Sequence, residues 1–195
     1  MSLFNTTELI QSLKKDLEAI ELTVQHDFSN LNPDQSNWKP DSESWSILEC
    51  LEHITLTNKI YQKRIKEAIQ GGVSKKMLPK ETFRSGFLGD LAVKAMKPGP
   101  NNQVKNKLKT FKFLVPYGSS LDGPAVLGSF SANLNELRDL LDESTQVDLK
   151  RIKIISLAGR LIQLRLGDAF RFIIVHTQRH IIQAQKLQTK QGFPS

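Results

Sequence analysis

The sequence has a single cysteine, few glycines and prolines, and no long apolar run. Cys50 is the only cysteine among 195 residues, so the chain cannot form an internal disulfide or a metal cage built from several thiolates. Eleven glycines and eight prolines are too few for a fibrous or low-complexity chain. No apolar run reaches the roughly 18–20 residues of a membrane-spanning helix, and residues 1–5 lack the layout of a secretory signal. We therefore expect a globular, cytoplasmic protein without membrane contact.

The length and the apolar content predict a single domain over residues 1–195. A domain commonly has about 100–200 residues, and an apolar fraction of 39% is enough to build a core. The formal net charge of +7 would suit an anionic partner, although ordinary globular proteins also reach it. Residues 94–112 hold six lysines and no acidic residue, so much of the charge surplus lies in one segment.

Apolar residues recur every three or four positions in four stretches of the chain. This spacing is typical of a helix that buries one face. Four long helices with a long connection between the second and the third predict an all-α fold, a four-helix bundle. The four predicted helices cover about 6–28, 46–72, 124–141 and 167–190.

Local signals predict where the second helix begins and ends. Ser46 and Glu49 have the spacing of a capping box, and Gly71-Gly72 is a typical helix end. The long connection that follows shows no clear periodicity. We expect a short helix at about 86–96, an extended segment at 110–115, and a strand or helix cap at 150–157.

Three of the four histidines fall on core-side positions of two predicted helices. His176 and His180 are four residues apart, which places both imidazoles on the apolar face of the last helix, about 6 Å apart along its axis. His53 lies at the margin of the apolar face of the second helix. Three imidazoles meeting from two helices would bind one divalent ion. A buried histidine bonded to a carbonyl or a carboxylate is the alternative interpretation, and both stay open at this point.

Three side chains near these histidines have both a functional and a structural interpretation. Glu49 lies one turn before His53 and would accept the second ring N–H of that histidine, or it closes the capping box. Gln183 would orient a bound water or substrate near His176, or it is exposed to solvent. Cys50 would face the site, or it is a small buried hydrophobe.

Two charged side chains at helix ends fit the helix dipole. Asp168 lies at the start of the last predicted helix, where a negative charge is favourable. His26 lies near the end of the first, where a solvated, positively charged ring is favourable.

Two segments of the sequence resemble the motifs of a known family. Residues 44–54, SWSILECLEHI, resemble the WS-x-x-E-x-x-x-H opening of the second helix in the DinB/YfiT-like superfamily of metal-binding four-helix bundles. Residues 172–183, FIIVHTQRHIIQ, resemble the H-x-x-x-H-x-x-Q motif of its last helix. Both motifs occur in the order of the family, and the helical pattern covers nearly the whole chain.

The resemblance implies a fold, a metal site and a class of chemistry. The implied fold is an up-down-down-up bundle with the long crossover between helices two and three. The implied site is made by His53, His176 and His180 and usually holds Ni²⁺ or Zn²⁺. Characterised relatives include transferases and isomerases that use bacillithiol, mycothiol or glutathione, while many others are assigned only as metal-dependent hydrolases.

Three hypotheses about function follow. The first is a metal-dependent enzyme for a small-molecule substrate, because an ion with an open coordination position makes a hydroxide from water or a thiolate from a thiol. The second is a non-catalytic metal- or small-molecule-binding bundle. The third, a basic module that binds nucleic acid through residues 104–112, is the least favoured because no DNA-binding motif is present. Val175 and Ile182, opposite the inner face of the last helix, indicate a homodimer or a further covering element.

Overall fold

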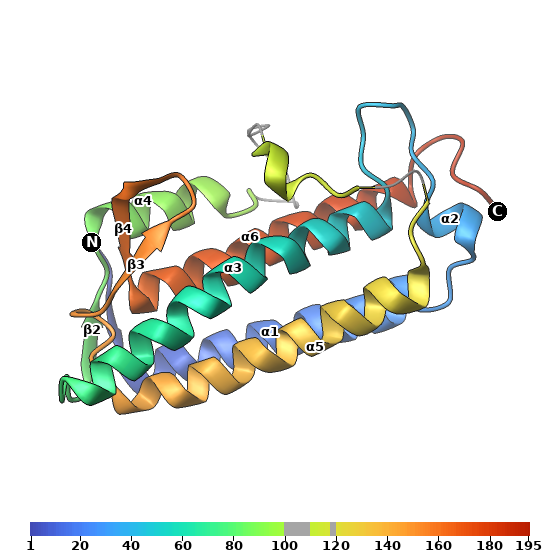
Figure 1. The fold of residues 1–195 in the computed structure, drawn as a ribbon. Coiled ribbons are helices and arrows are strands. Elements are labelled where there is room, and N and C mark those ends of the chain that lie inside the picture. The colour runs from blue at the N-terminus through green and yellow to red at the C-terminus, as the bar shows by residue number, and fades with distance from the viewer. Residues whose placement is uncertain (100–109, 118–119) are drawn as a thin grey trace.

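Four long helices form the body of the protein. They are α1 (Thr6–Phe28), α3 (Ile47–Ser74), α5 (Gly123–Glu143) and α6 (Leu166–Leu187). The structure is a computed structural model and describes residues 1–99, 110–117 and 120–195. Both α1 and α3 pack against α5 and α6, and α1 and α6 run opposite to α3 and α5 (Figure 1). The all-α fold expected from the sequence is confirmed.

Three of the four long helices, α1, α3 and α5, begin where the sequence supplies a capping side chain. The Asn5 side chain accepts a hydrogen bond of 3.1 Å from the backbone N–H of Glu8 at the start of α1. The capping box of α3 is complete, because Ser46 accepts from the backbone N–H of Glu49 and the Glu49 carboxylate accepts from that of Ser46. This start fixes the helical phase of α3 and places His53 on its buried side.

The prediction that α3 ends at Gly71-Gly72 is wrong. The helix continues to Ser74, and the residue with a left-handed backbone is Lys76, with φ of 51°. A Cβ atom on Gly72 would lie 2.5 Å from Cδ1 of Ile152, which is closer than real Cβ contacts allow. Gly72 therefore permits close packing against the segment after α5, and it does not terminate the helix.

Short elements connect and flank the long helices. The helix expected at 86–96 is confirmed as α4 (Phe87–Met96). Of the two alternatives expected at 150–157, a strand or a helix cap, the structure has the strand, β3 (Lys153–Ser156). The extended segment expected at 110–115 is wrong, because a turn of 3-10 helix occupies its middle. The remaining elements are β1 (Leu3–Asn5), α2 (Pro33–Ser36), β2 (Thr82–Arg84), η2 (Lys112–Leu114), η3 (Ser144–Gln146) and β4 (Gly159–Arg165).

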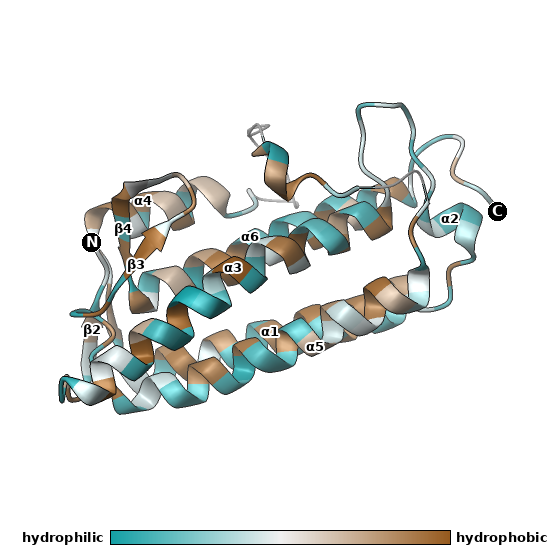
Figure 2. Cartoon of the chain, in the orientation of Figure 1, coloured by the Kyte–Doolittle hydropathy of each residue, from teal (hydrophilic) through white to brown (hydrophobic). Residues whose placement is uncertain are grey.

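Two small antiparallel strand pairs and α4 cover one end of the bundle. β1 pairs with β2, and β3 pairs with β4. α4 packs along α6 and also contacts β4, so an element outside the four long helices covers part of α6, while Val175 and Ile182 are both half-buried. The colouring in Figure 2 shows apolar residues on α4 and on the β3–β4 hairpin, and Phe87 and Leu161 there are exposed. The homodimer stays a prediction.

None of the helices in the described ranges combines the length and the apolarity that a membrane span requires.

Candidate metal centre

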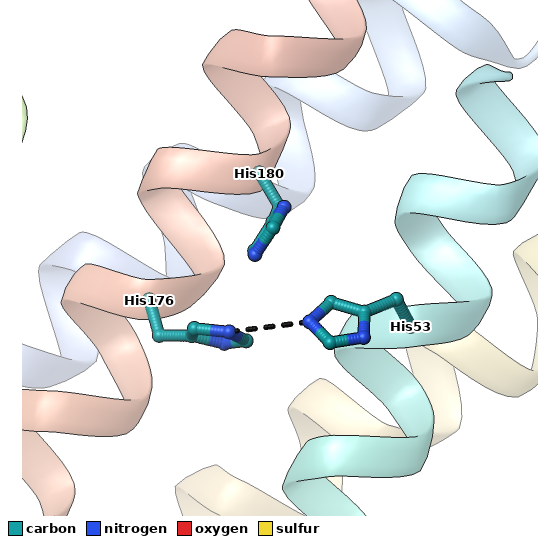
Figure 3. Close-up of side chains that lie close together, drawn as sticks. All are labelled: His53, His176 and His180. Carbon is teal, nitrogen blue, oxygen red and sulfur yellow. Dashed lines mark hydrogen bonds between the residues drawn. The ribbon is translucent and has the colours of Figure 1, made fainter. Parts of the chain in front are cut away.

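The three histidines selected from the sequence meet between α3 and α6. His53 comes from α3, and His176 and His180 come from successive turns of α6 (Figure 3). One ring nitrogen of each histidine lies within 4.8 Å of the others. Nε2 of His53 lies 3.3 Å from Nε2 of His176. We call these three residues the histidine cluster.

The spacing of the histidine cluster fits a divalent metal ion. Two nitrogen ligands at 2.0–2.1 Å from a tetrahedral ion lie about 3.3–3.4 Å from each other. The Nε2 atoms of His53 and His176 are 3.3 Å apart, and a ring nitrogen of His180 lies within 4.8 Å of the ligand nitrogens of both. Imidazole nitrogen is a common ligand for both Zn²⁺ and Ni²⁺. The residues therefore fit the kind of ion that the family resemblance implies.

Burial keeps the three imidazoles neutral. Burial lowers the pKa of His53, and the carbonyl of Leu114 only partly opposes that effect. The pKa of His176 is held well below its usual value, first by burial and then by repulsion from His180 and His53. The same two causes, burial and the charge of His53, lower the pKa of His180 to about 3. A neutral ring keeps a lone pair for a metal, so the cluster is ready to bind a cation at neutral pH.

Two of the three rings are oriented through their second nitrogen. Nδ1 of His53 donates a hydrogen bond of 2.9 Å to the carbonyl oxygen of Leu114 in η2. Nδ1 of His180 lies 3.1 Å from Oε1 of Gln183. Because both oxygens only accept hydrogen bonds, each Nδ1 carries the proton and each Nε2 is left to bind an ion. Nδ1 of His176 is buried and has no hydrogen-bond partner.

The two side chains considered as outer partners of the histidines have different positions. Gln183 contacts a ring of the cluster, although that ring is His180 and not His176. Glu49 closes the capping box and accepts a hydrogen bond of 3.0 Å from Nζ of Lys39. The second ring nitrogen of His53 is taken by a backbone carbonyl, so the structural interpretation of Glu49 holds.

Aromatic rings enclose the histidine cluster, and the sequence analysis assigned them no role there. The ring of Trp45 lies 4.6 Å from that of His53 and 5.8 Å from that of His180, centroid to centroid. Phe172 stacks on His176 at 6.0 Å. The signal for Phe172 was its position one turn before His176, and the signal for Trp45 was its place in the WS motif.

The segment between α4 and α5 contributes to the site through its backbone. Leu114 is buried, and its carbonyl oxygen is the partner of His53. No residue pattern could have revealed this contact, since any residue carries a carbonyl. Lys112 is exposed in the same turn. Lys105, Lys107 and Lys109 of the lysine-rich segment lie outside the described residues.

Three other predicted side chains lie outside the cluster. Cys50 is fully buried, and burial raises the pKa of its thiol, so it is an inert core residue. His26 is exposed and contacts Asp27. Asp168 does more than complement the helix dipole, because its buried carboxylate accepts hydrogen bonds from the backbone of Gly86 at 2.7 Å and from Arg171 at 3.0 Å.

The fold and the site agree with one protein family. The chain belongs to the DinB superfamily, whose family model matches residues 17–184. The matched region includes all three histidines, the whole of α3 and α5, the second half of α1 and all of α6 except its last three residues. Comparison with curated proteins and with solved structures gave no match.

Proposed function

We propose that the protein is a metal-dependent enzyme that transfers a low-molecular-weight thiol to an electrophilic small molecule. The observation that carries this proposal is the convergence of three neutral imidazoles, with two Nε2 atoms 3.3 Å apart. The ion would be held by His53, His176 and His180, with Ni²⁺ or Zn²⁺ the preferred metals. When bound, such an ion supplies an open position at which a thiol is held as thiolate, or water as hydroxide, at neutral pH.

The surroundings of the cluster favour thiol chemistry over hydrolysis. A metal-activated thiolate is itself the nucleophile, so the protein need not provide a general base. Among the described residues, the group of potential metal ligands contains three histidines and no carboxylate. Glu49, the nearest acidic candidate from the sequence, is bound to Lys39 and to the backbone of Ser46. Hydrolysis of a small substrate is therefore the second candidate.

The protein residues around the cluster would orient the ligands and limit access of water. Leu114 and Gln183 hold the protons on Nδ1 of His53 and His180 and turn both Nε2 atoms toward the common point. Trp45 and Phe172 cover the rings with apolar surface. A site of lower polarity strengthens the attraction between a cation and an anionic thiolate.

Metal analysis of protein purified without a histidine tag tests the site. We expect close to one divalent ion per chain in the wild type and almost none in His176→Ala. The matched control is His26→Ala, which removes an exposed histidine and should leave the metal content unchanged. Equal metal content in all three proteins, or no metal in any, would contradict the proposal.

Activity assays then separate the candidate functions. The metal-loaded protein is incubated with bacillithiol, mycothiol or glutathione and an alkyl halide. The expected reaction forms one carbon–sulfur bond and releases the halide and the thiol proton. Turnover with an ester and not with a thiol would favour the hydrolase. Bound metal without any turnover would favour a non-catalytic binding protein, and salt-sensitive DNA binding without metal would favour the nucleic-acid module.

A further inference from the structure

Thr57 is a buried residue of α3, one turn after His53. It lies between His53 and Tyr61 on one face of that helix, because the three residues follow one another at intervals of four. The ring of Tyr61 lies 5.8 Å from that of Phe172, and His53 meets His176 one turn further along α6. The antiparallel register of the two helices therefore places Thr57 at a level between Phe172 and His176.

The hydroxyl group of Thr57 behaves differently from those of other helical threonines. A buried threonine in a helix commonly donates its hydroxyl hydrogen to the carbonyl four residues earlier. The Oγ1 atom of Thr57 is buried and has no hydrogen-bond partner. Three other helical threonines make the usual bond at 2.8–3.0 Å: Thr23, Thr55 and Thr177.

Unpaired buried polar atoms are rare, and two of them belong to residues on the facing sides of α3 and α6. Within the described part of the chain, the buried side-chain atoms without a partner are Oγ1 of Thr57, Oδ1 of Asn58 and Nδ1 of His176. Leaving such a group unsatisfied is costly. Thr57 and His176 make no hydrogen bond with each other, so a single group that satisfies both must lie between them.

We infer that Thr57 is the positioning residue for His176, acting through one bridging water molecule. This inference rests on the proposed metal site and deepens it. Once Nε2 of His176 binds the ion, Nδ1 carries a proton that needs an acceptor. A water molecule accepts a hydrogen bond from this N–H group and also forms a hydrogen bond with the Thr57 hydroxyl, since water is both donor and acceptor. His176 then has an outer partner, as His53 has Leu114 and His180 has Gln183.

A pair of substitutions at Thr57 tests this role. Thr57→Val removes the hydroxyl and keeps the shape, whereas Thr57→Ser keeps the hydroxyl. We expect the Zn²⁺ affinity, measured by competition with a chromophoric chelator, to fall about 10- to 100-fold in Thr57→Val, as for other outer partners of metal ligands. Thr57→Ser should bind Zn²⁺ like the wild type. The control Thr55→Val removes another buried hydroxyl, one bonded to Leu51, and should also bind normally.

Nitrogen-15 NMR of the His176 ring in the protein saturated with Zn²⁺ gives a second measurement. We expect the proton on Nδ1 to be protected from exchange in the wild type and in Thr57→Ser, and to exchange rapidly in Thr57→Val. Equal Zn²⁺ affinity and an unchanged ring spectrum in Thr57→Val would overturn the role of Thr57 and leave the metal site standing. A wild type that binds no Zn²⁺ would instead contradict the proposed function, and the role of Thr57 would be overturned with it.

Discussion

Two polar clusters are buried along α6, and they differ in how their hydrogen bonds are satisfied. The aspartate cluster (Ser2, Ser85, Asp90, Asp168 and Arg171) lies at the start of the helix, and the histidine cluster lies two to three turns later. Arg171 bonds both carboxylates, at 3.0 and 3.2 Å, and Asp90 also accepts from the backbone N–H of Ser2 at 3.0 Å. No buried side-chain nitrogen or oxygen in the aspartate cluster lacks a partner, whereas the histidine cluster has an unpaired Nδ1.

The difference separates a structural role from a ligand-binding role. In the aspartate cluster, opposite charges satisfy one another and hold β2 and α4 against α6. In the histidine cluster, three groups of the same kind repel when protonated and are stable only as neutral rings. Such a cluster gains its missing interactions from a cation, which is why we assign function to it and stability to the other.

Lowering the pH should produce the largest difference between the two clusters in their effect on stability. His180 takes up a proton near pH 6.5 in the unfolded chain but only near pH 3 in the folded, metal-free chain. As the pH falls from 6.5 toward 3, the unfolded state binds more protons at His180 and the folded state therefore loses stability relative to it. We expect the free energy of unfolding of the metal-free wild type to fall relative to that of His180→Leu by about 1.4 kcal/mol per pH unit below pH 6. Urea denaturation from pH 7.5 to 5 measures it, and a constant difference would contradict it.

Asp90 of the aspartate cluster should respond only at lower pH. Burial tends to raise the pKa of Asp90, but hydrogen bonds from Ser85, Arg171 and Ser2 lower it overall. The contribution of Asp90 to stability is therefore present above pH 3.8 and lost only below that value. Between pH 6.5 and 4, His180 should change the stability and Asp90 should not.

Breaking the aspartate cluster should cost the most at neutral pH. Asp168→Asn removes the buried charge that Arg171 faces. We expect a loss of about 3 kcal/mol, the lower end for a broken buried pair, because Asp90 still accepts from Arg171. Chemical denaturation measures the loss. The Zn²⁺ content of the folded protein should stay at the wild-type value, and a parallel loss of metal would show that the two clusters are coupled.

Two glycine-to-alanine substitutions should change the stability by smaller amounts and in opposite directions. A Cβ atom on Gly89 of α4 would overlap the carboxylate of Asp168, so Gly89→Ala should destabilise the protein by about 1–3 kcal/mol. Gly128 in α5 has no atom within 4 Å of the same position, so Gly128→Ala should stabilise it by about 0.5–1 kcal/mol. Thermal unfolding of both variants checks the signs, and two destabilised variants would contradict the argument.

Removing a histidine should have the smallest effect on stability. His176→Leu replaces a ring that has an unpaired buried nitrogen with an apolar side chain of similar size. We expect the free energy of unfolding of the metal-free protein at pH 7.5 to change by less than about 1 kcal/mol, or to rise. Metal binding should be lost. A strong destabilisation without metal would mean that His176 is a structural core residue.

Much of the fold could be predicted from the chain because its signals are local. The bounds of α1 follow from its apolar spacing and from the cap at Asn5. The end of α3 could not be predicted, because Gly72 is required by Ile152, which is distant in the sequence. The β1–β2 pair was missed for the same reason: three residues at each end of a long interval pair only once the bundle has formed.

The candidate site divides in the same way. The interval of four residues determined that His176 and His180 share a face of α6, because helical geometry depends only on position along the chain. The tertiary structure decided that His53 meets them and that Trp45 and Leu114 contact the cluster. It also decided that Asp168 accepts a hydrogen bond from Arg171. Those contacts depend on how the helices pack, and packing is set by the whole core at once and not by any single segment.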